Sequence, residues 1–115
     1  MNPIAELNDR FRRGDAFGGS RSDHRTLGQY TMTSGVQALS PELQLQLIRL
    51  VQQFDSFTAD NDPYAEHYFG KVTLDGEDYF FKIDYYDPTL TRHSDDPASP
   101  NATRRVMTIM KTDEY

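Results

Sequence analysis

Two things are missing from this sequence: it has no cysteine, and nowhere do eighteen apolar residues follow one another. Without thiols the chain can form no disulfide, no thiolate nucleophile and no zinc–thiolate site. Without a long apolar run, or an apolar segment behind a basic start, we expect no membrane span and no secretory signal. These absences predict a soluble cytoplasmic protein, with no membrane partner, that depends on side-chain packing for its stability.

Two common kinds of binding motif are missing as well. The glycines do not have the spacing of phosphate-binding or dinucleotide-binding loops. The three histidines, His24, His67 and His93, do not have the spacing of zinc ligands. We therefore expect no cofactor.

The composition is that of a folded domain. The 115 residues are 37% hydrophobic and include seven phenylalanines and seven tyrosines, which is enough apolar material to offset the entropy of ordering the chain. The length is close to the commonest domain size, so we expect one domain over residues 1–115. Glycine, serine and charged residues between positions 14 and 28 predict a flexible loop.

The negative charge is concentrated in one part of the chain. The net charge is −6, and the segment Asp55–Asp96 holds eleven acidic residues against three basic ones. Such a segment repels nucleic acid phosphates and attracts basic protein surfaces, although it can also be an ordinary solvated surface. The basic residues cluster elsewhere and predict at most weak phosphate contacts: Arg10, Arg12, Arg13, Arg21 and Arg25.

Two helices are expected from capping residues and apolar spacing. Asn2 and Pro3 precede an apolar stripe at helical spacing, and arginines end this segment at Arg13. Ser40 and Pro41 open a second segment, whose apolar residues recur at helical spacing as far as Phe54. We expect the second helix to pack flat on a sheet as the main core helix.

Strands are expected at Gln29–Thr33 and Arg104–Lys111, and as a hairpin around Asp75-Gly76. The hairpin joins the alternating runs His67–Leu74 and Glu77–Tyr85. The predicted fold class is α+β: a small antiparallel β-sheet with a central hairpin, covered on one face by two α-helices. The pattern does not determine the strand order.

A two-residue turn predicts the register of the hairpin. If Leu74 faces Glu77, one face of the hairpin is apolar and should meet the helices. The other face is polar with two exposed rings, and its predicted pairs are Thr73 with Asp78, Lys71 with Phe80, Phe69 with Lys82, and His67 with Asp84.

Two small constellations are candidates for chemistry. His67 opposite Asp84, next to Glu66, has the makings of a general base, but such a cross-strand pair also commonly serves only to satisfy its own hydrogen bonds. Asp60, Asp62 and Glu66 offer oxygen ligands for a divalent cation, but the segment lacks the spacing of a calcium-binding loop and equally fits local turn and capping bonds.

The third candidate is a protein-binding surface that combines acidic side chains with aromatic rings. Rings supply anchors at interfaces, and charge steers the encounter. The residues we expect to contribute are Asp60, Asp62, Tyr64, Glu66, Phe69, Phe80, Asp84, Tyr86 and Asp87.

Three segments carry a resemblance to a known family: Leu7–Arg12 (LNDRFR), Asp60–His67 (DNDPYAEH) and Phe81–Asp87 (FKIDYYD), and Val106–Met110 fits the same pattern. They resemble a group of small bacterial proteins catalogued as domain of unknown function 3768, often carried on plasmids, phages and other mobile elements. The resemblance spans nearly the whole chain and is weakest over residues 14–28. Ala65 stands where the family pattern has glycine, so the sequence departs from the family pattern at this turn.

The family has no established activity or catalytic residues, so the resemblance assigns no role to any residue. It implies a genomic context on mobile elements, whose short acidic proteins often inhibit host defence nucleases by occupying basic protein surfaces. Our leading hypothesis is therefore a non-enzymatic protein, monomer or homodimer, that binds a basic protein surface, such as an anti-CRISPR or anti-restriction inhibitor. The alternatives are a small enzyme using His67 and Asp84, with or without a divalent metal, and a structural subunit of a larger assembly.

Overall fold

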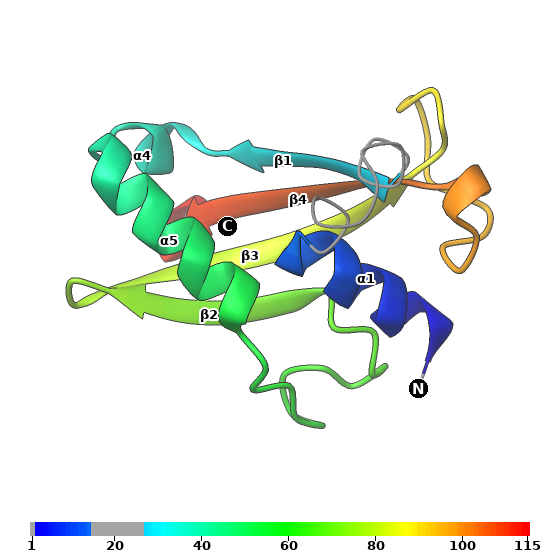
Figure 1. Ribbon diagram of the computed structural model, residues 1–115, viewed down its shortest axis with the longest axis horizontal. Helices are drawn as coiled ribbons and strands as arrows, with labels where there is room; N and C mark the ends of the chain where they lie inside the picture. The colour runs from blue at the N-terminus through cyan, green and yellow to red at the C-terminus, as the bar shows by residue number, and fades with distance from the viewer. Residues whose placement is uncertain (1, 15–26) are drawn as a thin grey trace.

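A computed structural model describes residues 2–14 and 27–115 (Figure 1). The expected flexible loop lies almost wholly outside these residues. The elements, in chain order, are α1 (Pro3–Arg13), β1 (Gly28–Met32), α4 (Ser34–Gln37), α5 (Pro41–Gln53), β2 (Phe69–Leu74), β3 (Glu77–Tyr86), the 3-10 turn η1 (Pro100–Ala102), β4 (Arg104–Lys111) and the 3-10 turn η2 (Thr112–Glu114). The α+β class is confirmed.

The four strands form one sheet in the order β1-β4-β3-β2. The hairpin register is as expected, from Leu74 opposite Glu77 to Phe69 opposite Lys82. Strand β4 has the expected bounds and pairs antiparallel with β3. The sheet is mostly antiparallel, as expected, but β1 differs from this expectation because it lies parallel to β4. Strand direction depends on how α4, α5 and the hairpin carry the chain across the sheet, which the residue pattern of β1 does not encode.

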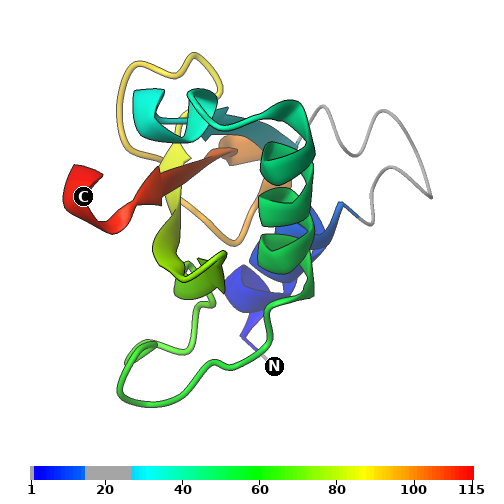
Figure 2. The ribbon, with the colours of Figure 1, turned by 90° about the vertical axis from the view of Figure 1, so that its left-hand side faces the viewer.

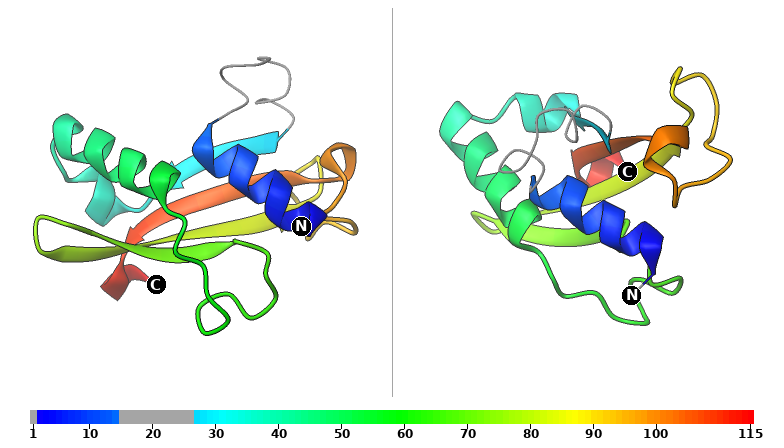
Figure 3. Two further views of the ribbon diagram at one scale, coloured as in Figure 1. Left: turned by 60° about the horizontal axis from the view of Figure 1, so that its bottom comes forward. Right: turned by 45° about the vertical axis from the view of Figure 1, so that its right-hand side comes forward.

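Both expected helices form, with the expected caps. The Oδ1 atom of Asn2 accepts a hydrogen bond from the backbone N–H of Ile4 at 2.8 Å, and the hydroxyl of Ser40 accepts one from the N–H of Leu43 at 3.2 Å. Helices α1 and α5 lie on the same side of the sheet, whereas η2 and the C-terminus lie on the other side (Figures 2 and 3). We call the helix-covered side the inner face and the opposite side the outer face.

The core lies between the inner face and the two helices. Its buried side chains come from every layer: Phe11 from α1, Leu47 and Val51 from α5, and inward residues of the strands, among them Val72, Tyr79, Phe81, Ile83, Met107 and Ile109. All the inward residues of β2 and β3 alternate with outward ones, as the register predicts. The sequence therefore specifies correctly which face of the hairpin is buried.

Two glycines are required by backbone geometry. Gly76 follows Asp75 at the hairpin tip, and the two residues have left-handed φ values of 76° and 53° respectively. A two-residue hairpin turn of the primed type requires such values. Gly28, with φ 151°, begins β1, and a Cβ atom there would overlap the backbone carbonyl oxygen of Arg105 in the neighbouring strand. Glycine therefore permits the close approach of β1 to β4.

The hairpin differs from expectation at its open end. Strand β2 begins at Phe69, two residues later than expected, because Ala65 (φ 55°) and His67 (φ 59°) are left-handed and cannot continue a strand. Ala65 thus has the conformation that favours glycine. In the part of the chain that the structure describes, no helix has the length and apolarity needed to cross a membrane.

Candidate functional site

The outer face carries three aromatic rings in mutual contact. Phe69 in β2 and Phe80 in β3 are diagonal neighbours with ring centroids 4.9 Å apart, and the ring of Tyr115 meets both edge-on at 5.8 Å and 5.7 Å. Neither α1 nor α5 covers this side, on which the described residues place the short turn η2 and the C-terminus (Figure 2). We call Phe69, Phe80 and Tyr115 the aromatic patch. Phe69 and Phe80 lie on the expected face of the hairpin, but they are half-buried and not exposed. Tyr115 was not anticipated, because nothing in its local sequence places it against the hairpin.

Charged residues surround the aromatic patch as pairs of opposite sign. The ammonium group of Lys82 lies 3.4 Å from the Oδ1 atom of Asp84, and that of Lys71 lies 3.9 Å from the Oδ2 atom of Asp78. The first pair is about two-fifths exposed and the second about half exposed, so each contributes little to stability. Tyr86 shares this face at the end of β3, where it forms an isolated β-bridge with His93.

The acidic residues expected in the binding surface have different environments. Asp60 and Tyr64 are exposed in the loop before β2. Asp87 organises its own turn by accepting hydrogen bonds from the Thr89 hydroxyl and the Thr91 N–H, and these bonds lower the pKa of its carboxyl. Asp62 is buried. Its expected place in an exposed surface is therefore wrong.

Asp62 holds the left-handed segment in place. Its Oδ1 atom accepts hydrogen bonds from the backbone N–H groups of Glu66 and His67 at 3.0 and 3.2 Å, and Oδ2 accepts a second bond from His67 N–H at 3.1 Å. A carboxylate that accepts several backbone bonds is expensive to replace when buried. Local capping, one of the two alternatives for this acidic segment, is what the structure contains.

His67 does not face Asp84, and the expected pair is wrong. The Nδ1 atom of His67 lies 3.0 Å from both carboxylate oxygens of Asp9 in α1, and Nε2 lies 3.8 Å from Oδ2 of Asp62. The imidazole also stacks on the ring of Phe57, with centroids 4.1 Å apart. The pair fails because the left-handed backbone at His67 turns its side chain out of the hairpin plane towards α1.

Asp9 links His67 to a buried arginine. Its Oδ1 atom accepts a hydrogen bond from Nη2 of Arg12 at 2.9 Å, and Nη1 of Arg12 donates to the carbonyl oxygens of Val51 and Gln52 at the end of α5. Burial lowers the pKa of Arg12, and the adjacent Asp9 carboxylate opposes that shift. The chain Arg12–Asp9–His67 thus joins α1, α5 and the loop before β2.

A second polar chain starts at the neighbouring residue of α1. Asn8 accepts a hydrogen bond from Nε of Arg105 at 2.6 Å and donates to the Tyr85 hydroxyl oxygen at 2.8 Å, and that hydroxyl donates to Oε1 of Glu66 at 2.8 Å. The Arg105 guanidinium also lies 5.3 Å from the Tyr85 ring centroid. Burial lowers the pKa of Arg105 to about 10 and raises that of Tyr85, so the guanidinium remains charged and the phenol neutral near pH 7.

Two shallow pockets border these chains. One, of about 310 Å³, lies beside His67 and Asp62 and is otherwise lined by Phe57, Thr58, Ala59, Pro63 and Ala65. The other, of about 210 Å³, lies where β3 extends beyond the start of β2, and its lining residues are Tyr64, Glu66, Tyr68, Lys82, Ile83, Asp84, Tyr85 and His93. The second pocket collects three of the residues expected in the binding surface: Tyr64, Glu66 and Asp84.

The candidate metal ligands Asp60, Asp62 and Glu66 are not brought together. Within residues 2–14 and 27–115, no group of three or more His, Asp or Glu side chains is placed to hold a metal ion. The Asp62 oxygens are already engaged by backbone N–H groups, and Glu66 Oε1 by Tyr85. The described residues therefore offer no cation site at this loop.

Sequence reasoning missed the buried polar residues Asn8, Asp9, Arg12 and Arg105. Asn8 and Arg12 are four residues apart in a helix, and Leu7 and Phe11 flank the same line. This spacing places them on one helix face beside the apolar stripe, which was the available signal. Arg105 had none, because a cation that follows another arginine, Arg104, at the start of a strand usually faces solvent.

The fold and its surfaces define a small α+β protein with one sheet face covered by α1 and α5, an opposite face that carries the aromatic patch, and no metal centre among the described residues. The chain belongs to the family described as protein of unknown function (DUF3768), which matches residues 32–114. Helix α1, which supplies Asn8, Asp9 and Arg12, lies outside the matched residues. The chain matches no curated protein and no solved structure.

Proposed function

We propose that the protein is a non-enzymatic binding protein whose outer sheet face docks on a basic surface of another protein. The observation that carries this proposal is the aromatic patch of Phe69, Phe80 and Tyr115 on the sheet face opposite α1 and α5. Rings gathered at the centre of a surface, with charged residues around them, have the arrangement of an interface anchor. The net charge of −6 favours a basic partner over nucleic acid.

The roles of His67 support a non-enzymatic function. Each of its ring nitrogens faces a carboxylate that also has a structural partner, because Asp9 binds Arg12 and Asp62 binds the loop backbone. A general base needs a free nitrogen within reach of substrate. The pair of His67 with Asp84, on which the catalytic alternative was built, is absent from this geometry.

The partner class follows from the family resemblance. If the gene is carried on a bacterial mobile element, a host defence nuclease with a basic nucleic-acid channel is the partner that the acidic charge and the aromatic patch would suit. An anti-CRISPR or anti-restriction inhibitor acts in this way. A structural subunit would also use the aromatic patch, but with a constant partner or a second copy of this chain.

The experiment is affinity capture from the lysate of the protein's own host, with three baits. The wild type is compared with Phe80→Ser, which removes one of the three rings of the aromatic patch, and with Leu45→Ser, a matched apolar-to-polar change on the exposed side of α5. We expect wild type and Leu45→Ser to capture the same nuclease subunit and Phe80→Ser to lose it. Salt should release the captured protein, because screening weakens the electrostatic contribution.

Two outcomes would overturn the proposal. Equal capture by Phe80→Ser and wild type would remove the outer face from the interface. Capture of only the same chain, with a doubled mass in light scattering that Phe80→Ser abolishes, would replace the inhibitor by a homodimer.

A further inference from the structure

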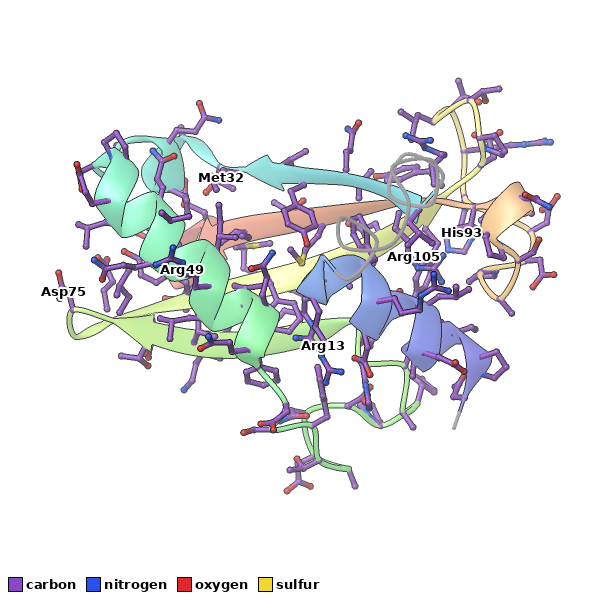
Figure 4. All side chains as sticks on the ribbon, viewed as in Figure 1. Arg13, Met32, Arg49, Asp75, His93 and Arg105 are labelled. Atoms are coloured by element: carbon purple, nitrogen blue, oxygen red, sulfur yellow. The ribbon has the colours of Figure 1, made fainter. Side chains whose placement is uncertain are left out.

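The pocket at the open edge of β3 exists because the two hairpin strands differ in length. Strand β3 continues to Tyr86, whereas β2 begins opposite Lys82. Beyond that point the loop before β2 contributes one bond to β3, from Ile83 N–H to the Tyr68 carbonyl, and the loop after β3 contributes another, from Ser94 N–H to the Tyr85 carbonyl. The two loops therefore form the walls of the pocket, at the end of the sheet opposite the Asp75 tip (Figure 4).

The pocket presents hydrogen-bond acceptors from three separate segments. Of the two carboxylate oxygens of Glu66, only Oε1 is hydrogen-bonded within the described residues, so Oε2 remains available. The carboxylate of Asp84 is about two-fifths exposed and has Lys82 as its ion-pair partner at 3.4 Å. His93 places Nδ1 2.8 Å from the Ser94 carbonyl oxygen, which requires a proton on Nδ1 and makes Nε2 an acceptor in the neutral ring.

Aromatic rings complete the walls. Tyr64 is 71% exposed, and Tyr68 and Tyr85 are half-buried. The inner side of the Tyr85 ring is occupied by the fully buried Arg105, so a guest must contact the pocket from the solvent side. Ring faces attract cations and carboxylates attract hydrogen-bond donors, so both kinds of wall favour a cationic, donor-rich group.

We propose that this pocket accepts an arginine side chain of the protein partner. A guanidinium is planar, carries five N–H donors and no acceptor, and therefore matches a pocket whose lining includes acceptors from three segments beside tyrosine rings. An anion would meet the carboxylates of Glu66 and Asp84. The inference rests on the proposed function and deepens it, because Lys82 lines the pocket and also lies 5.9 Å from the Tyr115 ring, which makes the pocket continuous with the aromatic patch.

The direct test is a titration of the purified protein with three short peptides that differ at one position: arginine, lysine or citrulline. Citrulline keeps the shape of arginine but lacks its charge. We expect the arginine peptide to bind about tenfold more tightly than the citrulline peptide, as charge-assisted hydrogen bonds are about twice as strong as neutral ones. The lysine peptide should bind with intermediate affinity, because a point charge contacts fewer acceptors.

Three variants test where the peptide binds and whether the bound group carries a positive or a negative charge. Glu66→Gln keeps an acceptor for the Tyr85 hydroxyl but removes the charge, and Asp84→Asn does the same at the other wall. Each variant should bind the arginine peptide about tenfold more weakly than the wild type, and its thermal unfolding temperature should be unchanged. Lys82→Gln removes a competing cation and should tighten binding about threefold. The Leu45→Ser variant should bind as the wild type does.

The results separate this inference from the proposed function. Equal affinity for the arginine and citrulline peptides, or weaker binding by Lys82→Gln, would overturn the arginine pocket, since the latter is the response of an anionic guest. Capture of the partner equally by Glu66→Gln and wild type would overturn it too, while leaving the docking face intact. Peptide binding without any captured partner would support the pocket and count against the proposed docking function.

Discussion

Phe80 and Phe81 are neighbours in β3 that face opposite sides of the sheet. Phe81 is fully buried and contacts the rings of Phe54 and Phe57, with the Arg12 guanidinium 5.6 Å from its centroid. Phe80 is half-buried and contacts only rings of the aromatic patch among the aromatic contacts of the described residues. The inner face thus uses its rings to hold helices, while the outer face keeps ring surface available to a partner.

The two faces also treat charge differently. On the inner side, Arg12 and Arg105 are fully buried, and each is held by helix α1 through Asp9 or Asn8. On the outer side, the Lys82–Asp84 and Lys71–Asp78 pairs are exposed. Removing a partner from a buried charge is costly, whereas exposed pairs can exchange partners at low cost. The comparison predicts that equivalent substitutions have unequal effects on the two faces.

The largest difference is expected between the two phenylalanines. Phe81→Ala should lower the free energy of unfolding by about 3–5 kcal/mol, because it leaves a cavity in the core. Phe80→Ala should lower it by only about 1 kcal/mol, since the ring is half-exposed. Urea unfolding measures this difference in the free energy of unfolding, provided that both variants show the same dependence of that free energy on urea concentration. Equal losses would show that the outer face is also part of the stabilising core.

The next largest difference is expected between two aspartates. Asp9→Ala removes the only carboxylate that hydrogen-bonds Arg12 among the described residues and should cost about 3 kcal/mol, as breaking a buried ion pair does. Asp84→Ala, its matched control on the outer face, should cost less than about 1 kcal/mol. The same urea experiment measures both. A small cost for Asp9→Ala would mean that Arg12 is sufficiently solvated without it.

A smaller gain in stability is expected in the loop that borders the inner network. Ala65 has φ 55°, and a left-handed residue with a Cβ atom is less stable than glycine by about 1 kcal/mol. Ala65→Gly should therefore raise the free energy of unfolding by about that amount. Ala59→Gly, in the same loop but without a positive φ, should lower it slightly. If both variants were destabilised equally, the left-handed conformation would store no strain.

The smallest effect concerns the anchor of Tyr115. Glu114 accepts hydrogen bonds from the Thr33 hydroxyl and from the N–H groups of Lys111 and Gly35, and these lower its pKa below the ordinary 4.5. A carboxyl with a lowered folded-state pKa contributes stability that is fully present above the unfolded value and disappears as pH falls through the folded one.

Glu114→Gln should therefore flatten the loss of stability that the wild type shows on acidification below about pH 4.5. It should also weaken partner capture, because Glu114 fixes η2 and thereby places Tyr115 on the outer face. Thermal unfolding of both proteins between neutral and acidic pH measures the first effect. Parallel pH profiles would show that the carboxyl is not specifically stabilised.

The local elements of this fold were predictable because their signals are local. Asn2 and Ser40 cap helices through backbone groups two or three residues away. Asp75-Gly76 favours a two-residue hairpin turn in which both residues have positive φ values. The hairpin register followed from that turn, and with it the faces of Phe80 and Phe81. The partner of His67 was not predictable, because a left-handed backbone at a non-glycine residue leaves no reliable sequence signal.

By itself, the sequence determined the two helices, the hairpin with its register, the last strand and the division of the hairpin into a buried and an exposed face. Only the tertiary structure decided that β1 joins β4 in parallel, that Asn8 and Asp9 connect two buried arginines to the loop before β2, and that Tyr115 lies on Phe69 and Phe80. The physical reason is range. Propensities, caps and turns act over a few residues, whereas these contacts join residues distant in the chain, and their energies depend on burial that exists only after the whole chain has folded.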